Sequence, residues 1–182
     1  MSLAMGVFFA FSATPAFASS PALVTTPEQE MAPNPARQSM FDPSQTSATP
    51  LGSIRIPAID LDETVRSGVA MEVIDQGVAH WVGTSSAGDP GNVVLAGHRT
   101  THSRPFWALG ELEVGDLIYM DDGWGFEVMY RVSDVYVVDP SALWITYDTD
   151  EPTLSMFACH PKGSARYRIV VSADLVAGRR IA

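Results

Sequence analysis

The chain has 182 residues, 46% of them hydrophobic, so it is long enough for one domain with a packed core and too short for two ordinary domains. Its net charge of −10 excludes nucleic acid as a favourable partner, because an acidic surface repels the phosphate backbone.

The first residues resemble an export segment. Residues 1–18 contain an apolar run from Leu3 to Phe11 and end in Ala16-Phe17-Ala18, which is similar to a signal-peptidase site. The run is shorter than the roughly 20 residues that a membrane-spanning helix needs. We expect an export signal or a truncated membrane anchor, and the sequence decides neither between these nor whether the segment is cleaved.

Residues 19–50 are rich in proline, serine and threonine. Such a composition buries too little apolar surface to order itself. It predicts a linker between a membrane and a domain, or an extension without a role.

From residue 51 to residue 182 the chain alternates between short apolar stretches and turn residues, which predicts one mainly β domain. Expected strands are 53–59, 92–96, 116–120, 126–138, 153–159 and 166–173. Expected short helices are 73–76, 105–112 and 141–144. Many short strands with little helix indicate a closed barrel or a sandwich.

Cys159 is the only cysteine, and it ends a predicted strand. A leftover thiol in an exported protein suggests a reactive group, although a free cysteine is also often a small buried hydrophobe. Arg168 begins the next strand, after a plausible turn, so the guanidinium and the thiol are expected at the same rim. Arg166 competes with Arg168, because residues two apart on a strand face the same way.

A cysteine nucleophile needs an acid/base partner, and four histidines are available. His98 is favoured because it follows the apolar strand 92–96 directly, after Gly97, which is expected to let the backbone turn. His160 neighbours the cysteine, but adjacent side chains on a strand point to opposite faces. His102 lies in a polar loop, and His80 fits a packed core position.

Metal and cofactor sites are not expected. A zinc site formed by Cys159, His160, His98 and His102 has no compact ligand spacing. The acidic pairs Asp121/Asp122 and Glu111/Glu113 lack the regular spacing of a calcium loop. A serine hydrolase is also disfavoured, because no G-x-S-x-G motif is present.

Several segments, in this order, resemble the sortase family of Gram-positive surface-protein transpeptidases. They are residues 53–60, the histidine segment 92–98, the stretch 105–116, residues 138–140, and the strand 153–159 followed by Arg168. The sequence Cys-His-Pro-Lys-Gly-Ser-Ala-Arg-Tyr-Arg at 159–168 is most similar to the actinobacterial sortases called class E.

This resemblance implies a closed eight-stranded sortase-type β-barrel with a few short helices. It implies a transpeptidase that cleaves a C-terminal sorting signal of the LPxTG or LAxTG type at threonine. Cys159 would form the thioacyl enzyme, His98 would move protons, and Arg168 would hold substrate and oxyanion. The implied partners are surface proteins that bear the signal, and an amine of a peptidoglycan precursor or a pilin lysine. The implied location is outside the cytoplasm of a Gram-positive bacterium, secreted or held at the membrane by the N-terminus.

The family's Thr-Leu-x-Thr motif before the cysteine is replaced here by residues 155–158, so the substrate preference at Ala158 is in doubt. Leu143, Trp144 and Arg166 are the further candidates for substrate binding, although the first two also fit simple packing positions. Two alternatives stay open: a cysteine hydrolase of cell-wall or surface peptides, and a binding barrel without catalysis. The native substrates, the exact motif, the acceptor and the oligomeric state are beyond the sequence.

Overall fold

The computed structural model describes residues 48–180. The predicted export segment 1–18, and all but the last residues of the predicted linker 19–50, lie outside the described residues. The first strand begins at Pro50, at the predicted boundary of the domain.

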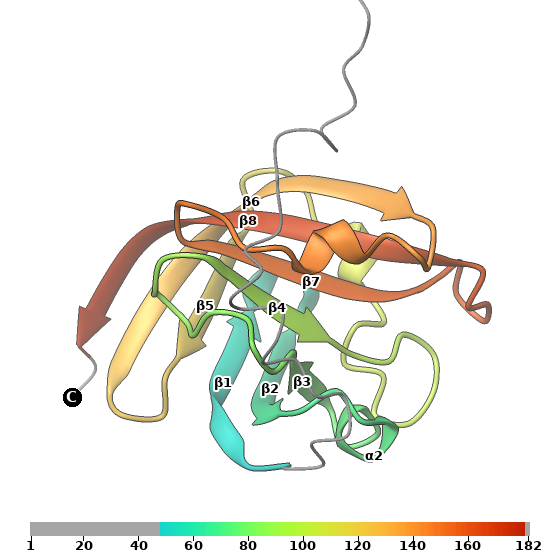
Figure 1. Ribbon diagram of the computed structural model, residues 1–182, viewed down its shortest axis with the longest axis horizontal. Coiled ribbons are helices and arrows are strands. Elements are labelled where there is room, and N and C mark those ends of the chain that lie inside the picture. Colours follow the sequence, from blue (N-terminus) through green and yellow to red (C-terminus); the bar gives the residue numbers. More distant parts are fainter. Residues whose placement is uncertain (1–47, 181–182) are drawn as a thin grey trace, which may run out of the picture.

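The described chain forms a closed barrel in the order β1-β2-β3-β4-β7-β8-β6-β5, as the resemblance predicted (Figure 1). Its strands are β1 (Pro50–Ile56), β2 (Leu61–Ser67), β3 (Val78–His80), β4 (Asn92–Ala96), β5 (Leu117–Asp121), β6 (Phe126–Val138), β7 (Thr153–His160) and β8 (Tyr167–Arg180). The helical segments are η2 (Pro57–Ile59), α2 (Met71–Ile74), η3 (Leu109–Glu111) and η4 (Leu143–Thr146). None of the helices within 48–180 has the length and apolar character needed to cross a membrane.

The strand order places β7 between β4 and β8. β4 and β7 are parallel, with Ala96 opposite Phe157, whereas β7 and β8 form an antiparallel hairpin. β1 pairs with β5 and closes the barrel. The carboxyl ends of β4 and β7 and the start of β8 therefore meet at one end of the molecule.

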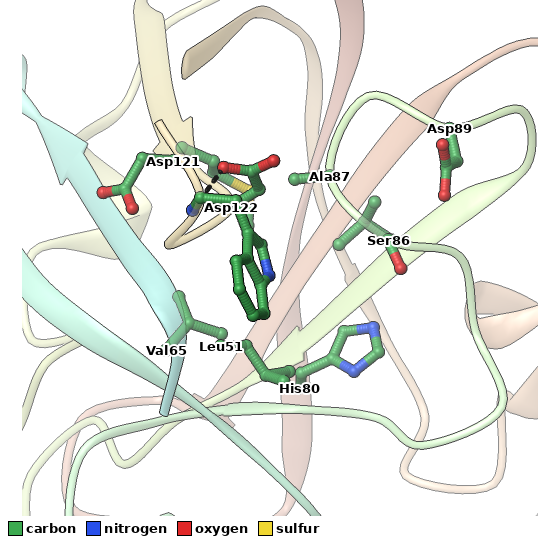
Figure 2. A pocket seen from close by; sticks show the side chains of 11 residues that line it. Leu51, Val65, His80, Ser86, Ala87, Asp89, Asp121 and Asp122 are labelled. Atoms are coloured by element: carbon green, nitrogen blue, oxygen red, sulfur yellow. Dashed lines mark hydrogen bonds between the residues drawn. The ribbon is translucent and has the colours of Figure 1, made fainter. Parts of the chain in front are cut away.

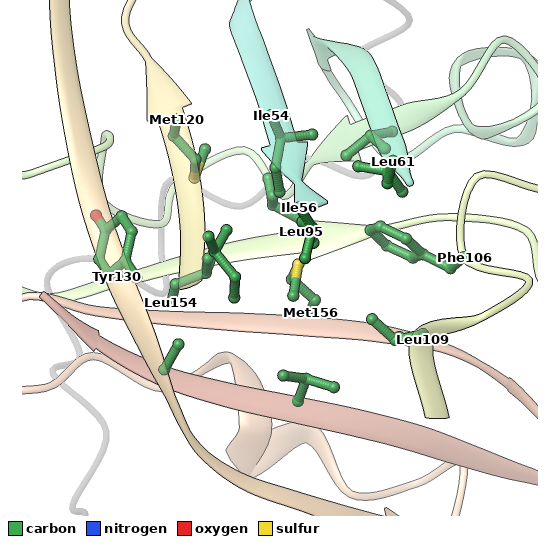
Figure 3. Packing of buried hydrophobic residues seen from close by; sticks show 14 of the residues in the cluster. Ile54, Ile56, Leu61, Leu95, Phe106, Leu109, Met120, Tyr130, Leu154 and Met156 are labelled. Carbon is green, nitrogen blue, oxygen red and sulfur yellow. The ribbon is translucent and has the colours of Figure 1, made fainter. Parts of the chain in front are cut away.

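Alternate residues of these strands fill the barrel (Figure 3). The side chains of Ile54, Leu95, Tyr130, Leu154 and Met156 are almost completely buried and meet in one cluster. Burying a side chain of this size stabilises the fold by about 1.5–3 kcal/mol, so the interior of the barrel holds the strands in register.

A second, smaller layer covers the outer face of β4. Val94 points away from the barrel cluster yet has no exposed surface. The loop with η4 lies nearby, because the buried Asn92 side chain donates hydrogen bonds at 3.0 Å to the carbonyl oxygens of Ile145 and Tyr147. Asn92 thus ties the η4 loop to the start of β4.

The structure corrects several predicted boundaries. Residues 57–59 form η2 and not the end of a strand, because Asp60 takes a left-handed conformation with φ of 51° and turns the chain into β2. The sequence analysis missed β2 and β3 altogether. β8 continues to Arg180, beyond the predicted end at residue 173, because it pairs with the full length of β6.

Candidate active site

His98 and Cys159 follow equivalent positions of two neighbouring parallel strands. Ala96 lies opposite Phe157, and the Gly97 amide donates to the Phe157 carbonyl at 3.3 Å. His98 and Cys159 are each two residues beyond that pair. Parallel strands in register therefore bring the imidazole segment beside the cysteine, although the two residues are distant in sequence.

On the other side of β7, Cys159 lies directly opposite Arg168 of β8. Residues opposite each other in an antiparallel pair have Cβ atoms roughly 4.5–5.5 Å apart, on one face of the sheet. The hairpin thus places the two residues at the same rim of the barrel. His98 follows β4, Cys159 is in β7 and Arg168 is in β8, so the three residues lie at one end of three adjacent strands.

The cysteine faces outward from the barrel. Its neighbour Ala158 is 2% exposed and belongs to the interior cluster, as does Ile169, the residue opposite Ala158. Because side chains alternate along a strand, Cys159 and Arg168 are on the outer face. The thiol is free and partly exposed. The Ala158 methyl group, which was a candidate for substrate binding, instead packs inside the barrel.

The two arginines that sequence could not separate have different positions. Arg168 is within β8, and its Nη1 donates to the carbonyl oxygens of Ala165 at 2.9 Å and of Tyr167 at 3.0 Å. Arg166 precedes the strand, is exposed, and stacks on the ring of Tyr167. The premise that both residues share one strand was wrong, since β8 begins at Tyr167.

The His98 imidazole has a carboxylate partner that the sequence analysis did not identify. Its Nε2 lies 2.8 Å from Oδ1 of Asp75, and the His98 side chain is only 15% exposed. Asp75 is the capping residue directly after helix α2. An ionised carboxylate only accepts hydrogen bonds, so Nε2 carries the proton and Nδ1 remains available in the neutral ring.

Gly97 has a different role from the one expected. Its φ is not in the left-handed region. A Cβ atom at this position would lie 2.7 Å from Cδ2 of Phe106, which is completely buried. Glycine is required here because the Phe106 ring packs against the backbone just before His98.

The other three histidines are placed differently. His160 Nδ1 lies 2.7 Å from Nη1 of the buried Arg99, on the side of β7 that also holds Ala158. His80 Nε2 lies 2.9 Å from the Ser85 carbonyl oxygen, and burial lowers its pKa below the ordinary 6.5. His102 stacks on His98 with ring centroids 4.7 Å apart. The zinc set of Cys159 with three histidines is therefore not assembled.

Leu143 and Trp144 lie in η4, in the loop that leads from β6 to β7. Trp144 stacks on Tyr136, with ring centroids 5.8 Å apart and planes 7° from parallel. Tyr136 is two residues before Val138, which pairs with Arg168. Trp144 is thus on the outer face that carries Arg168, whereas Leu143 is 59% exposed.

A cavity of about 290 Å³ opens near the other end of the barrel (Figure 2). It is lined in part by Leu51, His80, Asp121, Asp122 and Trp124. Val93, near the start of β4, also lines it, so this cavity is separate from the outer face with Cys159 and His98.

The closed barrel thus holds a half-buried cysteine on β7 between the segment that carries His98 and the strand that carries Arg168. The family model described as "Sortase domain" matches residues 54–176. The chain belongs to the sortase family.

Two relatives with similar sequences are also sortases. The chain is 28% identical to Sortase SrtE1 of Streptomyces coelicolor over 76% of its own length and 43% of that protein. It is 28% identical to Sortase D of Bacillus subtilis over 72% of its length and 65% of that protein. The chain therefore spans between 43% and 65% of the length of these relatives. The match to SrtE1 agrees with the class E resemblance.

Solved structures share the fold. A Clostridium perfringens sortase D5 transpeptidase matches with a TM-score of 0.66 and 25% identity over 72% of this chain and 82% of that chain. Sortase C-3 of Streptococcus pneumoniae matches with a TM-score of 0.69 and 28% identity over 75% and 67% of the two chains. Sortase E1 of Streptomyces coelicolor, solved with a tripeptide in its active site, matches with a TM-score of 0.68 and 24% identity over 73% and 91%.

Proposed function

We propose that this sortase is a cysteine transpeptidase that cleaves an LAxTG-type or LPxTG-type sorting signal at threonine and joins the acyl group to an amine. The observation that carries the proposal is the strand order β4-β7-β8, which brings His98, Cys159 and Arg168 to one end of the barrel. The membership in the sortase family, and the likeness to a Clostridium perfringens sortase D5 described as a transpeptidase, support it.

In this proposal the Cys159 thiol gives its proton to Nδ1 of His98, the sulfur attacks the threonine carbonyl carbon, and the amide bond breaks to leave a thioester. The departing amine needs a proton, which the His98 imidazolium supplies from Nδ1. The incoming amine then attacks the thioester, and neutral His98 takes a proton from it at the same atom. The bond between the carbonyl carbon and the Cys159 sulfur breaks, and the proton returns from His98 to the sulfur. Asp75 holds the Nε2 proton throughout, which keeps the ring in one tautomer. NMR tests this assignment: the ¹⁵N chemical shifts of the neutral His98 ring should be those of a protonated Nε2 and an unprotonated Nδ1.

Arg168 would stabilise the oxyanion of the tetrahedral intermediates. Its Nη1 is held by the carbonyl oxygens of Ala165 and Tyr167. The Nε and Nη2 hydrogens remain as donors for the substrate, because a guanidinium has five in a planar fork. Preorganised donors of this kind contribute strongly to acyl transfer.

The donor substrates would be surface proteins that bear the signal, and the acceptor would be an amine of a peptidoglycan precursor or a pilin lysine. This assignment implies work outside the cytoplasm of a Gram-positive bacterium, at the membrane or secreted. Trp144 and Leu143 of the η4 loop are proposed to contact the signal, together with Arg166 at the entrance to β8.

The test uses the full chain with fluorogenic LAxTG and LPxTG peptides, with and without a short glycine peptide. We expect cleavage by the wild type, a ligated product in mass spectra when the amine is present, and no turnover by Cys159→Ala. The fold of the variant is checked by circular dichroism. Unchanged turnover by Cys159→Ala would end the proposal, and cleavage without ligation for any amine would favour the hydrolase.

A further inference from the structure

Asp75, His98 and His102 form a cluster at the edge of the proposed active site. One side-chain ligand atom from each residue lies within 4.8 Å of the other two. Both imidazoles direct a nitrogen at the same carboxylate oxygen: His98 Nε2 lies 2.8 Å and His102 Nδ1 lies 3.4 Å from Asp75 Oδ1. The catalytic assignment uses the first contact and leaves His102 without a function.

The backbone holds this cluster in place. Asp75 is fixed at the end of α2 by amide hydrogen bonds to the carbonyls of Met71 and Val73. The loop that carries His102 is closed by a hydrogen bond from the Phe106 amide to the His98 carbonyl at 3.1 Å. His102 itself has a φ of 54°, in the left-handed region. The two histidine rings are stacked at 25°.

The spacing is close to that of metal ligands. Two ligands of a tetrahedral zinc ion lie about 3.3 Å apart when each is about 2.0–2.1 Å from the metal. The two nitrogen-to-oxygen distances, 2.8 Å and 3.4 Å, lie on either side of that value. The 2.8 Å contact has to lengthen slightly, and the two nitrogens, which lie within 4.8 Å of each other, have to settle at a similar spacing. His102 can adjust, because it is 48% exposed and its ring can turn on the solvent side.

The chemistry of the ligands selects the ion. Two imidazoles and one carboxylate suit zinc and similar transition metals, whereas calcium and magnesium prefer sites made only of oxygen. Three protein ligands leave a fourth position for water. Asp75 is 36% exposed, so the ion has a path from solvent, and the net charge of −10 attracts cations to the protein.

We propose that Asp75, His98 and His102 bind a zinc-like divalent ion, and that the ion switches off transpeptidation by capturing the imidazole of His98. The inhibitory half of this inference depends on the proposed function. The metal site itself stands on the cluster alone.

Inhibition follows from the tautomer of His98. In the metal-free ring Nε2 carries the proton and Nδ1 accepts one from the amine. A metal that binds at Nε2 uses the electron pair that otherwise holds the proton there. The single proton of the neutral ring therefore moves through solvent to Nδ1. Nδ1 is then a donor and cannot accept a second proton, and the step in which the incoming amine is deprotonated stops.

Zinc binding is measured by calorimetry, with zinc ions alone, on the full chain that carries Cys159→Ala. This background removes the thiol, which is itself a zinc ligand. We expect one zinc per chain, and at least a tenfold weaker affinity when His102→Ala is added. His80→Gln in the same background is the matched histidine control and should bind as tightly as the parent. No binding by the parent, or equal binding after His102→Ala, would overturn the metal site.

Inhibition is measured on peptide cleavage by the chain with its cysteine. We expect zinc to inhibit the wild type and a chelator to restore it. His102→Ala should retain metal-free turnover, because His102 takes no part in the proposed chemistry, and should need at least ten times more zinc for the same inhibition. Equal sensitivity of this variant would assign inhibition to Cys159 and overturn the switch. If the wild type cleaves no peptide, the calorimetry still decides the metal site, and the proposed function alone has failed.

Discussion

Arg168 is partly buried, and it differs from the exposed cations in what its guanidinium touches. Two backbone carbonyls of the turn before β8 accept hydrogen bonds from its Nη1. Its strand position is directly opposite Cys159. It also helps to keep the pKa of Asp139 below the ordinary value, after the larger effect of hydrogen bonds from Ser141. Arg168 therefore reaches both the turn and the end of β6.

We predict that Arg168→Lys lowers kcat/KM for peptide cleavage by about 100-fold, the scale on which loss of one oxyanion donor is felt. A lysine ammonium is a point charge and cannot hold both carbonyls while it presents a planar fork to the substrate. Steady-state kinetics on the LAxTG peptide measure the effect. Arg166→Lys is the comparison and should lower kcat/KM far less than Arg168→Lys does, because Arg166 is proposed to contact the signal and not the oxyanion. The reverse result, with Arg166→Lys the damaging change, would refute this assignment.

Among individual residues, those at the ends of strands could be predicted from the sequence. Cys159 and Arg168 flank a short turn between two apolar runs, so their pairing could be predicted from local pattern alone. Asp75 could not be found this way. It follows a four-residue helix far from His98 in sequence, and only the return of the chain through β3 and β4 brings the carboxylate to the imidazole. Its only signal was an acidic residue at the end of a short apolar helix.

The segment between β4 and η3 depends on one glycine. We predict that Gly97→Ala lowers the free energy of unfolding by about 1–3 kcal/mol, as overpacking usually does. The added methyl group would lie 2.7 Å from the Phe106 ring, and neither the ring nor the β4 backbone has room to move. Urea unfolding measures the change. We also expect Gly97→Ala to lower kcat by a larger factor than its effect on stability would suggest, because His98 is the next residue.

The double variant Gly97→Ala with Phe106→Leu isolates the cause. A smaller side chain at position 106 makes room for the methyl group, so the double variant should be less destabilised than the sum of the two single changes. Strict additivity would show that the cost comes from the backbone and not from contact with the Phe106 ring.

Elements with strong local patterns were predicted well, and elements that depend on a partner were missed. The strands over 92–96 and 126–138 have the predicted bounds, because dense β-branched and aromatic residues mark them. β2 contains Asp62, Glu63 and Arg66 and lacks a continuous apolar run. β3 has three residues, too few for any pattern. Both are strands because neighbours on either side supply hydrogen bonds.

For the whole molecule, sequence established the mainly β class, and the family resemblance supplied the closed barrel. The parallel pairs β2–β3 and β4–β7 could not be predicted from turns, since parallel strands are joined by long connections. The second pair is the one that places His98 beside Cys159. The proposed zinc site departs from the expectation that no metal binds, because that expectation considered sequence spacing only, and the carboxylate comes from another element.

The whole molecule also has a titrating group remote from the catalytic face. His80 lines the cavity near the other end of the barrel (Figure 2). Burial lowers its pKa below 6.5, and the hydrogen bond to the Ser85 carbonyl opposes this only in part. The folded state therefore takes up the His80 proton at a lower pH than the unfolded chain does. The contribution of neutral His80 to the free energy of unfolding is fully present above pH 6.5. It is lost as the pH falls through the pKa that His80 has in the folded state.

We predict that the free energy of unfolding of the wild type falls as the pH decreases from 6.5 towards 4, and that His80→Gln has a smaller slope there. Glutamine keeps a donor for the Ser85 carbonyl and does not titrate. The carboxyls of Asp122 and Asp139 also have lowered pKa values, but starting from 3.8, so their contribution is lost only at more acid pH. Urea unfolding at several pH values compares the two proteins. Parallel curves between pH 6.5 and 4 would mean that His80 does not carry this dependence, whereas convergence at acid pH would assign it to the buried imidazole.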